Sequence, residues 1–141
     1  MAKERLYPEG MLKPRGSYSQ VVISDPGQMV FTAGQVALDE NGKVIGVGDI
    51  TAQTRQVFEN IKRAVEAAGG TLNDVVSMTV FTTDARFSPA VSEVRRQIFG
   101  SNLPASTQVQ VASLMRPELL IEINAIAILP AKADSKLPIG E

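Results

Sequence analysis

The spacing of apolar residues predicts two helices, each with one buried face. Over residues 51–68, apolar side chains recur every three or four positions, and a pair of glycines follows where the helix would end. A second helix is predicted from an N-cap at Ser88, with Pro89 at its first position, to about Phe99. The residues expected to be buried are Val57, Phe58, Ile61, Ala64, Val65 and Ala68 in the first helix and Val91, Val94 and Ile98 in the second.

Five short segments have the β-branched or alternating composition that is typical of strands. The first two flank the turn at residues 25–27, which indicates a hairpin. In the last one, alternation places Glu122 on the face opposite Ile121 and Ile123. Residues 1–18 contain several prolines and glycines and are expected to form an irregular lead-in. Strands are expected at residues 20–24, 29–33, 75–83, 106–111 and 120–127.

This order of elements predicts one α/β (α+β) domain over residues 1–130, with a mixed sheet and both helices on one face. Residues 131–141 are polar and contain proline, so we expect them to form a flexible C-terminal tail. Two helices cover only one face of a sheet. The other face needs a cover, and we therefore expect the chain to assemble with further copies of itself.

The composition narrows the chemistry that is available. The chain has no cysteine and no histidine, which excludes thiolate nucleophiles, the Ser-His-Asp triad and most metal sites. We expect neither a metal nor an organic cofactor. The net charge is −1, whereas nucleic-acid binders carry a basic excess, so no nucleic-acid partner is expected. No apolar run reaches the roughly 20 residues that cross a bilayer, and no secretory signal is visible, so we expect no membrane partner and a cytoplasmic location.

Glu122 is the most informative candidate for chemistry, because it interrupts a nearly apolar strand. A buried carboxylate is unfavourable unless it is paired or hydrogen-bonded. It either takes a solvent-facing or structural position, or it orients water or accepts a proton in a cleft between subunits. Tyr18 either packs or lines a pocket, and Gly34 and Gln35 either form a plain turn or present backbone groups to a ligand. Residues 95 and 96, both arginine, are expected on the exposed face of the second helix.

Several motifs together resemble those of one family. Residues 16–20 (GSYSQ) resemble its G-P-Y-S-Q segment, with Ser17 in place of the proline, and residues 31–35 (FTAGQ) resemble its strand ending in S-G-Q. Residues 53–76 are similar to its Q-T-x-Q, N-I, A-A-G and D-V block, and residues 121–127 to its I-E-I-E-A-I-A strand. On this likeness the sequence is identified as a member of the RidA (reactive intermediate deaminase, YjgF-like) family.

The resemblance implies a chorismate-mutase-like fold, with a six-stranded mixed sheet and two helices on one face. It also implies a homotrimer with clefts between subunits. Archetypal members hydrolyse reactive 2-imino or enamine acids to 2-keto acids and ammonia without a cofactor. By this resemblance Glu122 would position the attacking water, Tyr18 would accompany it in catalysis, and Gly34 and Gln35 would contact the substrate.

The sequence departs from the family where an arginine normally binds the substrate carboxylate. Ser106 occupies that place, followed by Thr107 and Gln108, and two helix positions expected at the cleft hold Ser92 and Arg95. A neutral hydroxyl lacks the charged, bidentate fork of arginine. We therefore expect ordinary 2-imino acid deaminase activity to be absent or very weak.

Three functions are compatible with this departure. The first is a hydrolase or deaminase with an altered or uncharged substrate, or one that recruits Arg15, Arg95 or Arg116 to hold a carboxylate. The second is a non-catalytic trimer that binds a small metabolite or regulates a partner. The third is a nucleic-acid or translation factor, which the charge balance disfavours.

Overall fold

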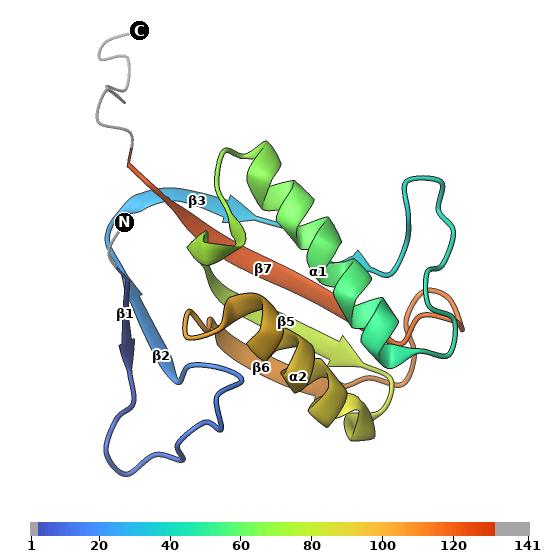
Figure 1. Cartoon of the computed structure of the whole chain (residues 1–141), viewed down its shortest axis with the longest axis horizontal. Helices are drawn as coiled ribbons and strands as arrows, with labels where there is room; N and C mark the ends of the chain where they lie inside the picture. Colours follow the sequence, from blue (N-terminus) through green and yellow to red (C-terminus); the bar gives the residue numbers. More distant parts are fainter. Residues whose placement is uncertain (1–2, 132–141) are drawn as a thin grey trace, which may run out of the picture.

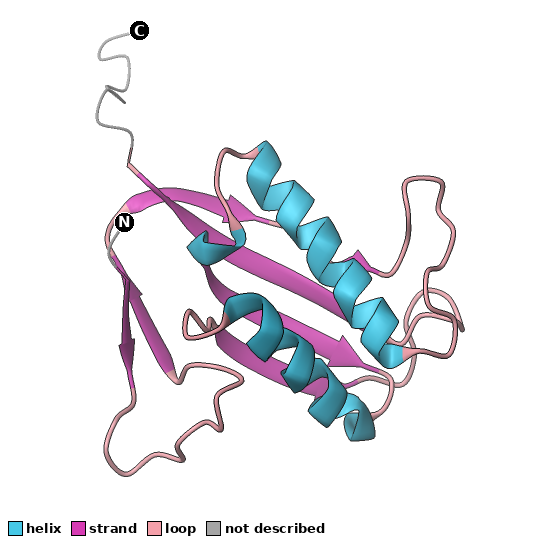
Figure 2. Ribbon diagram, viewed as in Figure 1, coloured by secondary structure: helices cyan, strands magenta, loops and turns pink. Residues whose placement is uncertain are grey.

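Two helices lie side by side across one face of a mixed sheet in the computed structural model of the chain, which describes residues 3–131 (Figures 1 and 2). The helices are α1 (Ile50–Ala67) and α2 (Ser88–Phe99), and two 3-10 turns, η1 (Leu72–Asp74) and η2 (Ala85–Phe87), precede β5 and α2. The strands are β1 (Lys3–Leu6), β2 (Val21–Ser24), β3 (Gly27–Phe31), β4 (Gln35–Val36), β5 (Val75–Thr82), β6 (Ala105–Gln110) and β7 (Ile121–Pro130).

The main sheet has five strands in the order β3-β7-β5-β6, with β4 also paired to β7. Strands β5 and β6 are parallel and are connected through α2, whereas every pairing of β7 is antiparallel. The predicted mixed α+β architecture, with both helices on one face, is therefore confirmed.

The core lies between the helices and the inner face of the sheet. Alternate residues of β7, including Ile121 and Ile123, are fully buried, while Glu122 on the other face is only half-buried. Most of the predicted helix stripe is buried as well, but Ala68 is exposed beyond the end of α1, and Ala64 and Ile98 are only partly buried. Phe58 of α1 packs edge-to-face on Phe99 of α2 with ring centroids 5.6 Å apart. The alternation read from the sequence is thus the alternation between core and open face.

The predicted hairpin is wrong. Strand β2 pairs with β1, and β3 pairs with β7, so the turn at Asp25 and Pro26 passes the chain from one sheet to the other. Part of the expected irregular lead-in is strand β1, whose sequence KERL has the charged composition of an edge strand and no apolar alternation. Instead of one six-stranded sheet, there is a two-stranded sheet and a five-stranded one, which meet at the parallel bridge between Ser19 and Ala105.

Helix α2 begins differently from the prediction. Its N-cap is Phe87, without a side-chain capping bond, and Ser88 is already helical. The reason is that η2 leads directly into α2, and the capping side chain belongs to Asp84, which accepts the backbone N–H of Arg86 at the start of η2. The Ser-Pro signal therefore marked the helix but misplaced its cap by one residue.

The predicted tail at residues 131–141 lies outside the described residues, apart from Ala131. Within residues 3–131, neither helix combines the length and the apolar character that crossing a bilayer requires.

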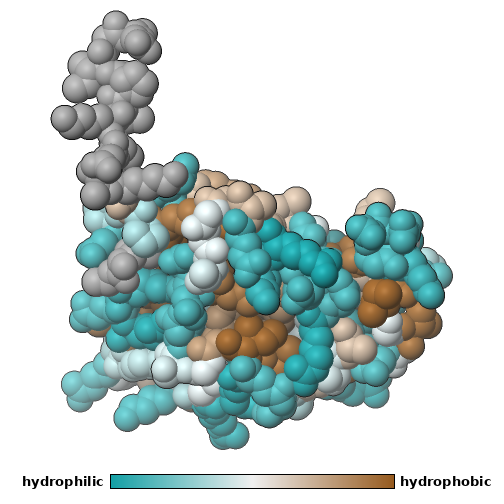
Figure 3. Space-filling model, turned by 45° about the horizontal axis from the view of Figure 1, so that its top comes forward, coloured by the Kyte–Doolittle hydropathy of each residue, from teal (hydrophilic) through white to brown (hydrophobic). Residues whose placement is uncertain are grey.

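The sheet face opposite the helices carries exposed apolar side chains. Met29 and Phe31 of β3 are 55% and 66% exposed, and Val109 of β6 is 41% exposed. This face points away from the viewer in Figure 1, while the side seen in Figure 3 is mainly hydrophilic with limited hydrophobic patches. The uncovered face predicted from the sequence is present in the single chain.

Candidate functional site

The predicted site residues form two groups on opposite faces of the sheet. Glu122 stands in register with Phe81 of β5 and lies on the open face. Ser106 stands in register with Met78, a core residue beneath the helices. One subunit therefore does not bring the Glu122 carboxylate and the Ser106 hydroxyl together.

The group on the helix side is built around Arg95. Its Nη1 donates to Ser106 Oγ at 2.8 Å, and its Nη2 donates to Ser92 Oγ at 3.2 Å and to Gln108 Oε1 at 3.5 Å. The Arg95 side chain is therefore held between α2 and β6 by three neutral oxygen atoms, all from residues that the sequence had placed in the substrate site.

Arg95 is only 4% exposed, so the expectation that it decorates the helix surface is wrong. Its neighbour Arg96 is exposed as predicted and pairs with Glu93 at 2.9 Å. The signal that could have revealed Arg95 is its position, four residues after Val91 and four before Phe99, both of which are buried. Because arginine is charged, it was assigned to the exposed face, although its spacing places it among the buried residues of the helix.

Burial dominates the electrostatics of this group. Desolvation lowers the pKa of Arg95 to about 10, the nearby Arg96 adds to the effect, and Tyr18 is close enough to oppose it. No carboxylate pairs with the guanidinium among residues 3–131, and its Nε is buried without a hydrogen-bond partner. The site thus holds a positive charge that nothing in the described chain neutralises.

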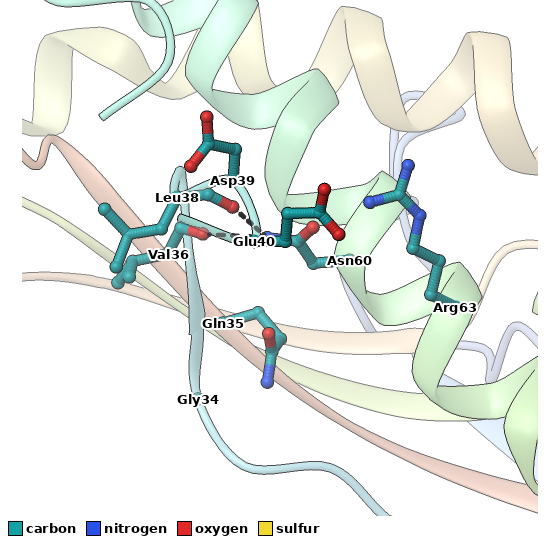
Figure 4. A pocket seen from close by; sticks show the side chains of 8 residues that line it. All are labelled: Gly34, Gln35, Val36, Leu38, Asp39, Glu40, Asn60 and Arg63. Carbon is teal, nitrogen blue, oxygen red and sulfur yellow. Dashed lines mark hydrogen bonds between the residues drawn. The ribbon is translucent and has the colours of Figure 1, made fainter. Parts of the chain in front are cut away.

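The group on the open face consists of Gly34 and Glu122, whereas Gln35 is in register with the core residue Ile123 and therefore lies on the helix side. The Glu122 side chain lies so close to Gly34 that a Cβ atom there would be 2.9 Å from the carboxylate carbon. Gly34 and Gln35 also border a cavity of about 420 Å³ between residues 34–40 and α1 (Figure 4). Its other lining residues are Val36, Leu38, Asp39, Glu40, Asn60 and Arg63.

The other predicted residues lie apart from Arg95. Thr107 is exposed and, by its register with Thr79, lies on the open face. Arg116 donates to the carbonyl of Gly42 in an exposed loop, and Arg15 is exposed. Of the three arginines considered as replacements, only Arg95 reaches Ser106.

Several residues in the motifs hold the fold together. Ser19 Oγ donates to the carbonyl of Leu103 at 2.6 Å, which anchors the segment before β6. The fully buried Gln53 side chain donates to the carbonyls of Gly46 and Glu118 and accepts from the N–H of Leu120. These amide and hydroxyl groups satisfy buried backbone groups in loops, a role that the sequence pattern alone did not indicate.

The architecture and motifs can be compared with known proteins. A protein-family model described as Endoribonuclease L-PSP matches residues 9–129. The chain belongs to this family, the RidA (YjgF-like) family. Among its relatives is the 3-aminoacrylate deaminase RutC of Acinetobacter baylyi, 40% identical over 127 residues that cover 90% of this chain and 98% of RutC.

Solved structures of RidA-family proteins share the fold. The Rid protein YyfB of Yersinia pestis has a TM-score of 0.84 and 33% identity, covering 92% of this chain and all of YyfB. The structure of Escherichia coli TdcF with bound serine has a TM-score of 0.67 and 36% identity, covering 86% of this chain and 92% of TdcF.

Proposed function

We propose that this RidA-family protein is a cofactor-independent hydrolase that deaminates a small reactive imine or enamine at clefts between the subunits of a homotrimer. We expect its preference among such substrates to differ from that of arginine-containing relatives, because Ser106 replaces the carboxylate-binding arginine. The observation that carries the proposal is the half-buried Glu122 carboxylate on the open sheet face, where the absence of a side chain at Gly34 leaves room for it.

The chemistry suits a chain without histidine or cysteine. An enamine becomes an imine by moving a proton from nitrogen to carbon, and the imine carbon is then electrophilic. Water adds to that carbon while the Glu122 carboxylate accepts its proton. Return of that proton to nitrogen gives a carbinolamine. Transfer of the hydroxyl proton to the amino group, by way of the same carboxylate, then expels ammonia and leaves a carbonyl group. Positioning one water molecule beside one base is sufficient for this sequence of steps.

The relatives support the reaction class. RutC is named as a 3-aminoacrylate deaminase, and its likeness extends over nearly its whole length. TdcF was crystallised with serine, which is a small molecule with a carboxylate and an amino group. A ligand of that size and polarity is what we propose for this chain.

The open sheet face supports assembly. Exposed apolar side chains such as Phe31 and Met29 are typical of surfaces that a partner covers. A neighbouring copy would also bring a second set of site residues next to Glu122, which its own Ser106 does not approach. In this proposal each cleft takes Glu122 from one subunit and the Arg95–Ser106 group from the next.

A non-catalytic, metabolite-binding or regulatory trimer is the second candidate. The replacement of arginine by Ser106 favours it, because a pocket can persist after its catalytic selectivity is lost. The two candidates share the cleft and differ in turnover.

The test is ammonia release from 2-iminobutyrate and from 3-aminoacrylate, both generated in the assay, with wild type and Glu122→Gln. We expect wild type to accelerate ammonia release from 3-aminoacrylate and to act weakly or not at all on 2-iminobutyrate, and the variant to lose about 100-fold or more in rate. Glu118→Gln is the matched control, since Glu118 is an exposed glutamate outside the site. A wild-type rate equal to that of buffer would contradict the hydrolase and leave the binding trimer.

A further inference from the structure

Arg95 carries a charge that its structural role does not require. Its three contacts join α2 to β6 through neutral oxygens of Ser106, Ser92 and Gln108. A neutral donor could tether these side chains equally well. Burying a guanidinium without a counter-charge is unfavourable, and buried arginines are normally matched by carboxylates. The positive charge therefore points to an anion that does not come from residues 3–131.

We infer that Arg95 binds the carboxylate of the substrate in place of the missing strand arginine, with Ser106 supporting its guanidinium. The inference rests on the proposed function for the identity of the substrate. What is new is the position of the cation, which projects from α2 onto Ser106 and does not belong to β6 itself.

Gln108 marks the place where the carboxylate enters. Its contact with Arg95 Nη2, at 3.5 Å, is the longest of the three and the weakest. Gln108 also lines a cavity of about 290 Å³ between the end of β6 and the start of α2. If the Gln108 side chain rotates away, a ligand oxygen can take the place of its amide oxygen on the guanidinium.

A second unsatisfied group borders the same cavity. Thr82 is fully buried, and its hydroxyl has no hydrogen-bond partner. Among the described residues only three buried side-chain polar atoms lack a partner. Two of them are Arg95 Nε, in a residue that contacts Gln108, and Thr82 Oγ1, in a residue that lines the same cavity as Gln108. A carboxylate oxygen entering here would meet one charged donor and one hydroxyl donor that the free subunit leaves unused.

The test compares Arg95→Gln with Arg96→Gln, its exposed neighbour on the same helix. The substrates are 3-aminoacrylate and its neutral amide, 3-aminoacrylamide. We expect Arg95→Gln to raise KM for the acid about 10- to 100-fold, the effect of losing one charge-assisted contact. KM for the amide should stay within about twofold, since it has no charge to lose. Arg95→Gln combined with Ser106→Arg should recover binding of the acid.

Two results would overturn the assignment. One is an equal loss on acid and amide, which indicates a purely structural role. The other is dissociation of the assembly in Arg95→Gln, which indicates that a carboxylate of a neighbouring subunit pairs with Arg95.

A binding measurement separates this inference from the proposed function. Calorimetric titration with 2-oxobutyrate and its amide needs no turnover. If wild type binds the keto acid, Arg96→Gln does too and Arg95→Gln does not, the inference stands even when ammonia release is absent. If wild type and Arg95→Gln bind 2-oxobutyrate equally, the inference fails even when hydrolysis is observed.

Discussion

The backbone of Gly34 lies directly against the carboxylate of Glu122. A Cβ atom on residue 34 would be 2.9 Å from the carboxylate carbon and 3.2 Å from Cγ, closer than ordinary packing allows. The glycine is therefore needed for space, and it fixes where the carboxylate can sit on the open face of the sheet. Any role of Glu122 in orienting water depends on this contact.

Gly34→Ala should reduce turnover while the fold persists. The added methyl group forces the Glu122 side chain to move, and a displaced base positions water poorly, so we expect kcat to fall by about 10-fold or more. Thermal melting should change little, because the side chain that must move is flexible. Ala33→Ser, a change of similar size at the exposed preceding residue, is the control. Unaltered kcat in Gly34→Ala would show that the Glu122 position is unimportant.

Arg95→Met should be nearly neutral for stability. Burial lowers the pKa of Arg95 from its ordinary value to about 10, which corresponds to roughly 3 kcal/mol against the charged form. Removing the charge relieves this, while three hydrogen bonds worth about 1 kcal/mol each are lost. Urea unfolding at pH 7 should therefore give a free energy within about 1 kcal/mol of wild type. A loss of about 3–5 kcal/mol would instead indicate a broken buried ion pair.

The pH dependence of the unfolding free energy of wild type and of Arg95→Met tests the same burial penalty independently. Below pH 10 the guanidinium is charged in both the folded and the unfolded chain, so its burial penalty is fully present. Above about pH 10 the folded chain begins to lose this proton while the unfolded chain still holds it, so this residue's contribution to stability rises with pH. The difference in unfolding free energy between wild type and Arg95→Met should shift in favour of wild type as pH passes 10.

Gln53→Leu should be strongly destabilising. The side chain satisfies the carbonyls of Gly46 and Glu118 and the N–H of Leu120, and leucine leaves all three without a partner. Each unsatisfied buried group costs about 1–3 kcal/mol, so we expect a loss of about 3 kcal/mol or more in denaturant unfolding. Gln97→Leu, at an exposed position of α2, should stay within about 0.5 kcal/mol of wild type. Equal stabilities would mean that Gln53 is not a tether.

Phe31→Asp should disrupt the proposed assembly. Phe31 is 66% exposed on the open sheet face, and a carboxylate there would be buried by a neighbouring subunit. Light scattering after size exclusion should give wild type the mass of three chains and the variant that of one. Met115→Asp, 90% exposed in a loop, should keep the wild-type mass. A monomeric wild type would contradict the trimer directly.

The sequence predicted the elements that depend on local periodicity. Helix α1 and the two faces of β7 follow from apolar spacing, and Glu122 stood out because it breaks an apolar run. Strand partners were not predictable in the same way, because the pairing of β3 with β7 joins residues about one hundred positions apart. The signal at residues 25–27 correctly predicted a turn, but it wrongly predicted that the two strands on either side of that turn pair with each other.

The sequence predicted which residues belong to the candidate site but did not predict how they are arranged in space. Ser92, Ser106 and Gln108 converge as the motif positions implied, but Arg95 was read as a surface residue because of its charge. Its burial depends on the hydrogen bonds that it donates to the two serines and to the Gln108 amide, and these contacts form only in the folded chain. The separation of Glu122 from this group by the thickness of the sheet follows from strand register, which the motifs do not encode.

The central claim is that Glu122 of one subunit and Arg95 of the next complete a single cleft, and mixing two impaired variants tests it most directly. Glu122→Gln and Arg95→Gln are co-expressed with different tags, and mixed assemblies are isolated and assayed with 3-aminoacrylate. Each isolated mixed trimer has one cleft of its three with both native residues, so activity should return to about a third of wild type. Mixed assemblies no more active than the two variants assayed separately would contradict a site shared between subunits.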